Sequence, residues 1–222
     1  MNTTGTLFIV ATPIGNLKDI TYRAVEVLSD VDIIACEDTR HTKILLEHYQ
    51  IKKPLISYYE YNKIKRTDTI IAYLKDGKNI ALVSDAGTPG ISDPGAGLIK
   101  KVLEEDLKVE VIPGPTAFIP ALVASGLPTH KFIFEGFLPA KSGARKKHLE
   151  RLKEEKRTLI FYESPHRICR TLEDIKAVFG SRHIVIAREL TKKFEEIIRA
   201  PADAVLEIFK NRKPKGEFII LV

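Results

Sequence analysis

Short apolar segments alternate with stretches of helical periodicity along almost the whole chain. Segments such as TYRAVEVLSD (21–30) and AGLIKKVLEED (96–106) repeat apolar residues every three or four positions, which predicts amphipathic helices. Between them lie short apolar runs, the candidate strands: LFIVA (7–11), DIIACE (32–37), LIS (55–57), NIALVS (79–84), VEVIP (109–113), FIFEG (132–136), TLIFYE (158–163), HIVIAR (183–188) and EFIILV (217–222). This alternation predicts an α/β fold. The early runs are nearly continuous in apolar residues, which predicts parallel strands with helices on both faces.

A helix of small residues, TAFIPALVASG (116–126), ends in Gly-Leu-Pro before a new strand–helix series begins. We therefore expect two α/β lobes, residues 1–126 and 127–222, in a chain long enough for each to bury its own core. The segment GEFIILV (216–222) predicts a central strand of the second lobe.

The composition excludes several classes of protein. No apolar stretch approaches the roughly 20 residues that span a bilayer, and the first residues do not resemble a secretory signal, so a cytoplasmic protein is expected. Cys36 and Cys169 belong to no cluster with metal-ligand spacing, so neither a disulfide nor a metal site is expected. The formal charge of +6 permits a polyanionic partner.

Glycine is concentrated after the fourth predicted strand, in SDAGTPGISDPGAG (84–97), and a second turn, PGPTA (113–117), follows the fifth. Ligands of α/β sheets bind beyond the carboxyl ends of strands, where glycine lets the backbone approach them closely. The chain contains neither GxGxxG nor GxxxxGK[ST], which disfavours a dehydrogenase or a P-loop kinase. Neither loop contains Lys or Arg, so a neutral adenosine or a cationic sulfonium fits better than a triphosphate. The alternative interpretation is two tight turns without a ligand.

Charged side chains gather after the second predicted strand, in EDTRHT (37–42). Glu37, Asp38 and His41 are candidate proton acceptors, and Arg40 is a candidate substrate contact. The alternative is a helix start capped by Asp38 or Thr39.

Two segments of the second lobe offer further candidates. In ESPHR (163–167), Ser164 and Pro165 suit a helix start, which leaves Glu163, His166 and Arg167 as candidates. In ARELTKK (187–193), we expect at least one of Arg188, Glu189 and Lys192 to contact a bound ligand or the substrate.

Residues 141–157 hold eight Lys or Arg against three Glu, a local charge of +5. This composition is typical of an arm that contacts phosphates, and also of a solvated helix face with Glu–Lys pairs.

Seven motifs, in order along nearly the whole chain, resemble the ribosomal RNA small subunit methyltransferase I family of the tetrapyrrole-methylase-like superfamily. They are TPIGNLKDIT (12–21), ACEDTRHT (35–42), SDAGTPGISDPG (84–95), PGPTA (113–117), EGFLPAK (135–141), FYESPHR (161–167) and ARELTKKFE (187–195). Thr88 replaces the acidic residue of the superfamily's glycine loop, which favours the ribosomal RNA branch. Family members often extend beyond the strand at 217–222.

The resemblance implies a mostly parallel sheet in the first lobe, a mixed sheet in the second, S-adenosylmethionine in the cleft between the lobes, and a homodimer. The implied reaction is 2′-O-methylation of a cytidine in 16S ribosomal RNA of the small subunit. The donor contacts that it implies are Ala11, Pro13, Gly87, Thr88, Gly90, Ile91, Ser92, Thr116, Ala117, Phe161, Tyr162, Leu190 and Gly216. The expected RNA contacts are Arg40, Lys141, Arg145, Lys146, Lys147, Arg167 and Lys192.

Two alternatives remain at this point. A tetrapyrrole C-methyltransferase would share the fold, although the basic segment argues against it. A non-catalytic RNA-binding module of the ribosome would not need to bind S-adenosylmethionine.

Overall fold

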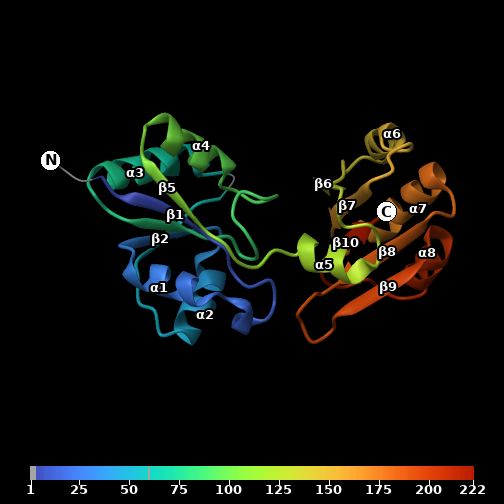
Figure 1. The fold of residues 1–222 in the computed structure, drawn as a ribbon, viewed down its shortest axis with the longest axis horizontal. Coiled ribbons are helices and arrows are strands. Elements are labelled where there is room, and N and C mark those ends of the chain that lie inside the picture. The colour runs from blue at the N-terminus through green and yellow to red at the C-terminus, as the bar shows by residue number, and fades with distance from the viewer. Residues whose placement is uncertain (1–3, 60) are drawn as a thin grey trace. The chain divides into compact units, whose positions relative to one another are not determined.

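The computed structural model describes residues 4–59 and 61–222 and divides the chain into two compact units, Met1–Thr116 and Ala117–Val222 (Figure 1). The predicted division after residue 126 differs from this boundary by one helix, α5, because that helix packs on strands of the second unit. No helix of the described residues is long and apolar enough to cross a membrane.

Strands and helices alternate as the sequence predicts. In chain order the elements are β1 (Thr6–Val10), the 3-10 helix η1 (Leu17–Asp19), α1 (Tyr22–Asp30), β2 (Ile33–Cys36), α2 (Thr39–His48), β3 (Leu55–Ser57), α3 (Lys63–Lys75), β4 (Ile80–Leu82), α4 (Ala96–Glu104), β5 (Lys108–Ile112), α5 (Phe118–Ser125), β6 (Phe132–Phe137), α6 (Ser142–Arg151), β7 (Thr158–Glu163), α7 (Ile168–Phe179), β8 (His183–Arg188), β9 (Glu196–Pro201), α8 (Ala202–Lys210) and β10 (Phe218–Leu221).

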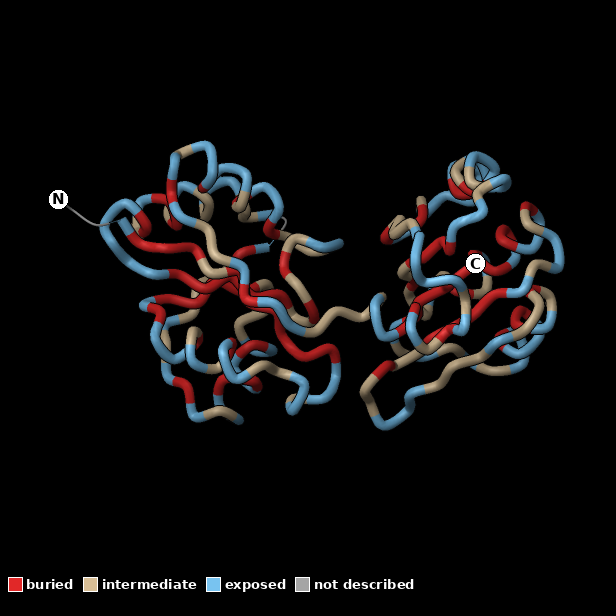
Figure 2. Tube along the Cα trace, in the orientation of Figure 1, coloured by how far each residue is buried: buried red, intermediate tan, exposed pale blue. Residues whose placement is uncertain are grey.

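The first unit is a sheet of five parallel strands in the order β3-β2-β4-β1-β5. Helices α1 and α2 lie on one face of it and α3 and α4 on the other (Figure 1). Neighbouring strand residues alternate between the two cores: Ile33 packs with α3 and α4, whereas Ile34 packs with α1 and α2. The central strands β1, β2 and β4 are therefore buried on both faces (Figure 2), which explains their continuous apolar character.

The second unit is a mixed sheet in the order β6-β7-β10-β8-β9. Strands β6 and β7 are parallel and the other neighbours are antiparallel, which confirms the predicted sheet type. Its largest core joins α6, α7 and α8 to one face, while α5 contacts β8, β9 and β10. Strand β10 lies between β7 and β8, which confirms that GEFIILV forms a central strand.

All nine predicted strands form, but the sequence analysis missed β9. This strand, EIIRAP, contains two charged residues and a proline and pairs only with β8 at the sheet edge. An edge strand is half-exposed and tolerates such residues, so it lacks an apolar signature.

Candidate active site

The carboxyl ends of all five strands of the first sheet lie along one edge, because the strands are parallel. The sequence-predicted candidates therefore occur in the strand order, with the 37–42 segment after β2, the long glycine loop after β4, Ala11 and Pro13 after β1, and the 113–117 turn after β5. This is the edge at which α/β sheets bind ligands.

Backbone hydrogen bonds join the loop after β1 to the glycine loop. The Thr12 amide donates to the Gly87 carbonyl (2.8 Å), and the Gly87 amide donates to the Thr12 carbonyl (2.9 Å). The Thr12 hydroxyl also donates to the carbonyl of Ser84 (3.0 Å). Since Thr12 is buried and pairs with the loop through three hydrogen bonds, the two segments form one wall.

The turn after β5 is attached to the same wall. The Thr88 hydroxyl donates to the Pro115 carbonyl over 3.2 Å. A Cβ at Gly114 would lie 3.0 Å from the Cβ of Ala11, so a side chain here would push the two segments slightly apart. Eight of the predicted donor contacts lie in these three segments of the first unit: Ala11, Pro13, Gly87, Thr88, Gly90, Ile91, Ser92 and Thr116.

The backbone of the glycine loop is held in an uncommon conformation. Ser92 has a φ of +62°, although it is not glycine, and lies in the exposed part of the loop. Non-glycine residues in this region cost of the order of 1 kcal/mol, and such strain clusters at binding sites. The neighbouring Ile91 is a large apolar side chain, and 42% of its surface is exposed to solvent.

Carboxylates lie next to this wall, and no basic side chain belongs to it. The Asp38 amide donates to the Asp85 carboxylate over 3.2 Å, which links the end of β2 to the glycine loop. Burial raises the pKa of Glu37, and the charges of Asp85 and Asp38 raise it further. A wall without a basic side chain, beside the carboxylates of Glu37 and Asp85, suits a positively charged sulfonium and disfavours a polyphosphate.

Asp38 is the N-cap of α2, as the structural alternative predicts. Its carboxylate accepts from the backbone amide of Arg40 (2.8 Å) and from the Arg40 guanidinium (2.8 Å). Hydrogen bonds from Arg40 lower the pKa of Asp38 to about 2, so this carboxylate is a weak proton acceptor. Glu37 and the exposed His41 remain as candidates at this edge.

The structure encloses Glu163, a predicted catalytic candidate, within the second unit. Only 2% of Glu163 is exposed. Its carboxylate accepts from the Thr171 hydroxyl (2.6 Å) and the Ser164 amide (2.8 Å), and lies 3.2 Å from the Arg167 guanidinium. Glu163 therefore fastens the start of α7, because all of its oxygens are engaged inside the unit.

Two predicted RNA contacts, Arg145 and Arg167, have partners inside the second unit. Only 2% of Arg145 is exposed, and its guanidinium forms an ion pair with buried Asp174 (2.6 Å). Arg167 donates to the carbonyl of Leu138 (2.5 Å) as well as pairing with Glu163. Both arginines hold the unit together, whereas Lys141, Lys146 and Lys147 are exposed on and beside α6.

Lys192 is half-buried and bridges two acids, Glu189 (3.0 Å) and Glu217 (2.7 Å). Glu189 has a φ of +51°, and a Cβ at Gly216 would lie 2.4 Å from its side chain. Gly216 has a φ of +92° and leaves room for the Glu189 side chain, which sequence reasoning did not foresee. Of the other predicted donor contacts in this unit, Phe161 is a core side chain, Leu190 is buried, Tyr162 is half-buried, and Ala117 is the N-cap of α5.

Cys36 and Cys169 are both free thiols. The described residues contain no group of three or more His, Cys, Asp or Glu that could hold a metal ion.

Comparison with known proteins decides the family. The family model of the tetrapyrrole (corrin/porphyrin) methylases matches residues 6–206. The ribosomal RNA small subunit methyltransferase I of Escherichia coli O157:H7 is 52% identical over 225 residues, covering 100% of this chain and 78% of its own. That of Thermotoga maritima is 48% identical over 218 residues, covering 98% of each chain. The chain belongs to the ribosomal RNA small subunit methyltransferase I family.

Solved structures of other proteins have the same fold as this member of the methyltransferase I family. A diphthine synthase matches 98% of the chain and 89% of its own with a TM-score of 0.75 at 14% identity. A uroporphyrin-III C-methyltransferase from Thermus thermophilus in complex with S-adenosylhomocysteine matches 98% of the chain and 97% of its own with a TM-score of 0.69 at 18% identity. These comparisons confirm the predicted superfamily and fold.

Sequence reasoning missed two features at the carboxyl edge of the first sheet. Asp85 was read only as part of the glycine loop, although it raises the pKa of Glu37. Tyr59 and Tyr61, which follow β3, are exposed aromatic side chains at the same edge. The signal for both was available, since each follows a predicted strand of the same parallel sheet.

Proposed function

We propose that this chain uses S-adenosylmethionine to methylate the ribose 2′-hydroxyl of a cytidine in 16S ribosomal RNA of the small subunit. The observation that carries the proposal is the edge of the first sheet, where three linked loops without a cation lie beside Glu37 and Asp85. Family membership supports ribosomal RNA as the acceptor, because the relatives at about half identity are named for it.

The residues of the first unit fit the donor. Backbone groups of Gly87, Gly90 and Thr116 would hold its uncharged parts, and the carboxylates of Glu37 and Asp85 favour a nearby positive charge. When bound, the donor supplies an electrophilic methyl group on a positively charged sulfur. Contacts of the donor with Ala117, Tyr162, Leu190 and Gly216 of the second unit remain predictions.

Glu37 is the proposed proton acceptor. A ribose hydroxyl is a weak acid, so its proton must leave as the oxygen attacks carbon. The raised pKa of Glu37 makes its carboxylate a stronger base than that of Asp38, which Arg40 neutralises. The chain's other contribution is orientation, because an in-line displacement requires the reacting atoms to be held collinear.

The experiment is radiolabelled methyl transfer from S-adenosylmethionine to small ribosomal subunits that lack the modification. Naked 16S RNA and a tetrapyrrole precursor serve as parallel acceptors, and digestion to nucleosides locates the label. Label on a cytidine ribose supports the proposal. Label on the tetrapyrrole alone would replace the acceptor, and donor binding without label on any acceptor would contradict the enzymatic assignment.

We also propose that the enzyme acts as a homodimer in the cytoplasm, where small subunits are found. The family resemblance supports this. Light scattering of the purified full chain tests the oligomeric state, and a monomer at micromolar concentration would contradict it.

A further inference from the structure

Two tyrosines that directly follow β3 are exposed to solvent. Tyr59 exposes 39% of its surface and Tyr61 exposes 94%, whereas Tyr58 between β3 and this pair is buried. The rings of Tyr59 and Tyr61 form an edge-to-face pair with centroids 6.4 Å apart. Ile64, which is 80% exposed, follows in the first turn of α3. Such a cluster of large exposed side chains is typical of a binding surface.

The loop that carries the tyrosines is held by its own hydrogen bonds. The Asn62 side chain accepts from the Tyr59 amide (2.9 Å) and donates to the Ser57 carbonyl (3.2 Å). Inside the unit, the Tyr58 hydroxyl lies 3.4 Å from that of Thr67 in α3. The backbone amide of Tyr59 and the carbonyl of Ser57 are thus held by Asn62 before RNA binds, which lowers the entropic cost of binding.

The tyrosine loop lies beside the candidate proton acceptor. The Tyr58 amide donates to the Cys36 carbonyl over 2.7 Å, which continues the pairing of β3 with β2. Tyr59 thus follows the end of β3 as Glu37 follows the end of β2. The glycine loop lies on the other side of β2, after β4. The tyrosines consequently occupy the side of the carboxylates away from the proposed donor loops.

Positive charge accompanies the rings. Residues 59–66 contain three basic residues, Lys63, Lys65 and Arg66, against one acid, Glu60. Within residues 4–59 and 61–222, neither Lys65 nor Arg66 forms an ion pair. This is the more notable because residues 1–116 as a whole hold 14 Lys or Arg and 16 Asp or Glu. A basic, aromatic surface on an otherwise acidic unit favours an anionic ligand with flat rings.

We propose that Tyr59 and Tyr61 stack an unpaired nucleobase of the RNA strand that carries the target ribose, and that Lys65 and Arg66 contact its phosphates. The inference rests on the proposed function and specifies how that site holds single-stranded RNA. Proteins bind unpaired strands by stacking bases on aromatic side chains beside Lys and Arg. If the base next to the target nucleotide is stacked here, the ribose of the target nucleotide would lie near Glu37.

The test measures RNA affinity and donor affinity separately on the full chain. The probe is a fluorescently labelled single-stranded RNA of mixed sequence, titrated by anisotropy, and donor binding is followed by calorimetry. Tyr59→Leu and Tyr61→Leu should each weaken RNA binding about five- to 150-fold, the range measured for one stacked base. Donor affinity should stay unchanged. Tyr59→Phe and Tyr61→Phe keep the rings and should bind RNA like the wild type.

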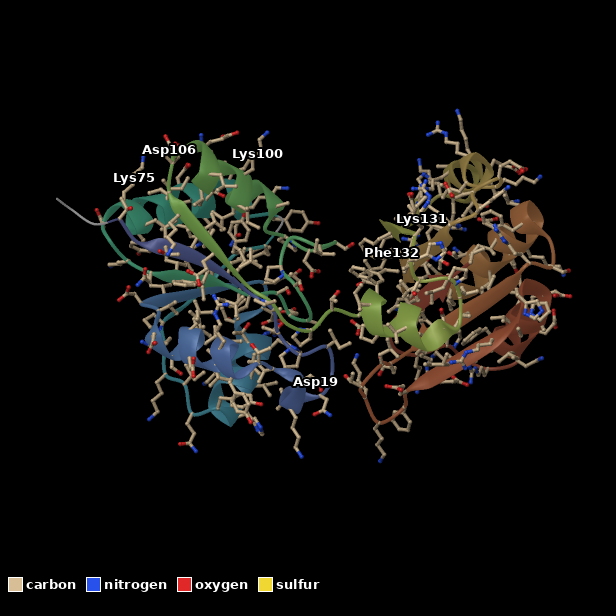
Figure 3. All side chains as sticks on the ribbon, in the orientation of Figure 1. Asp19, Lys75, Lys100, Asp106, Lys131 and Phe132 are labelled. Carbon is tan, nitrogen blue, oxygen red and sulfur yellow. The ribbon has the colours of Figure 1, made fainter. Side chains whose placement is uncertain are left out.

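A charge control lies on the same helix. Lys65→Ala should lower the slope of log K against log salt by about 0.7, as one phosphate contact does. Lys75→Ala, at the last turn of α3 (Figure 3), should leave the salt slope unchanged.

Leucine variants that bind RNA like the wild type would overturn the stacking inference while leaving the proposed function intact. Leucine variants that lose only dimerisation would assign the surface to a second copy and also overturn it. A wild-type chain that binds donor but no RNA would contradict the proposed function itself.

Discussion

Glu37 combines a raised pKa with a position at the carboxyl edge, and the two have one origin. The side chain is half-buried at the end of β2, and the carboxylates of Asp85 and Asp38 lie near it. Each of these features penalises its ionised form. The same surroundings that make Glu37 a better base therefore make it a poor contributor to stability.

Glu37→Gln should lower methyl transfer by about a hundredfold or more, which is the usual effect of losing a proton acceptor. Because the wild-type pKa is raised, the folded protein holds this proton more tightly than the unfolded chain, and stability falls as Glu37 ionises above about pH 4. The variant should therefore gain stability relative to the wild type as pH rises through this range. Rate profiles and urea unfolding against pH measure both effects, and an unchanged rate would remove Glu37 from the mechanism.

Thr88→Arg should weaken S-adenosylmethionine binding by more than about tenfold, which calorimetry detects as a loss of more than about 1.4 kcal/mol. The arginine side chain would occupy the space beside the glycine loop, and its charge would repel the sulfonium. The hydrogen bond from Thr88 to Pro115 would also be lost. Thr88→Ser keeps the hydroxyl and is the matched control. Equal donor affinity in Thr88→Arg would move the donor site away from this loop.

The sequence did not predict which of the charged residues are buried. Arg145 sits within a basic run and resembles its neighbours Lys146 and Lys147, but its partner Asp174 is 29 residues away. Glu163 ends a strand just as Glu37 does, but Thr171 and Arg167 enclose it. Such differences depend on packing between helices, which a charge pattern does not encode.

At the scale of elements, the Arg145–Asp174 pair fastens α6 to α7. Asp174 also accepts from the Ser142 hydroxyl at the start of α6 (2.9 Å), and Arg145 donates to the carbonyl of Ala140 (3.1 Å). The exposed lysines of α6 are thus carried on a helix whose inner face is fixed by a buried ion pair.

Arg145→Ala should lower the free energy of unfolding by about 3 kcal/mol, because it leaves a buried carboxylate without its main partner. Lys147→Ala, which removes an exposed lysine from the same helix, should cost less than about 1 kcal/mol. Replacing both partners, as Arg145→Met with Asp174→Leu, should recover most of the loss. Urea denaturation compares the three, and a double variant as unstable as Arg145→Ala would contradict this account.

Elements were more predictable than residues. All nine predicted strands form where the sequence has short apolar runs, and the central strands β2, β4 and β1 of the first sheet are the ones buried on both faces. The missed strand β9 and the position of the division at α5 both depend on what packs beside them, since EIIRAP is an edge strand and α5 serves the second sheet.

At the scale of the whole molecule, charge is divided unevenly between the units. Residues 117–222 hold 21 Lys or Arg against 13 Asp or Glu, a formal charge of +8, although the chain as a whole carries +6. The excess of the second unit includes the exposed lysines at 141, 146 and 147.

The Lys146→Glu, Lys147→Glu double variant should weaken RNA binding and reduce its salt slope by about 1.4, or about 0.7 for each lost phosphate contact on a single strand. Anisotropy titrations at several salt concentrations measure this. Lys100→Glu on α4 of the first unit is the matched charge reversal and should leave the slope unchanged. A slope that stays constant in the double variant would make α6 a solvated helix face.

The order of strands in the two sheets also has a consequence for synthesis on the ribosome. All five strands of the first sheet are contiguous in sequence and are complete at Ile112, so that unit has every strand that it needs while the second is still being made. The second sheet has a gap at its centre until β10 is translated, because β7 and β8 each pair with β10 and not with one another. During that interval the nascent chain exposes two unpaired strand edges, and this is the stage of its production at which a chaperone would be needed most.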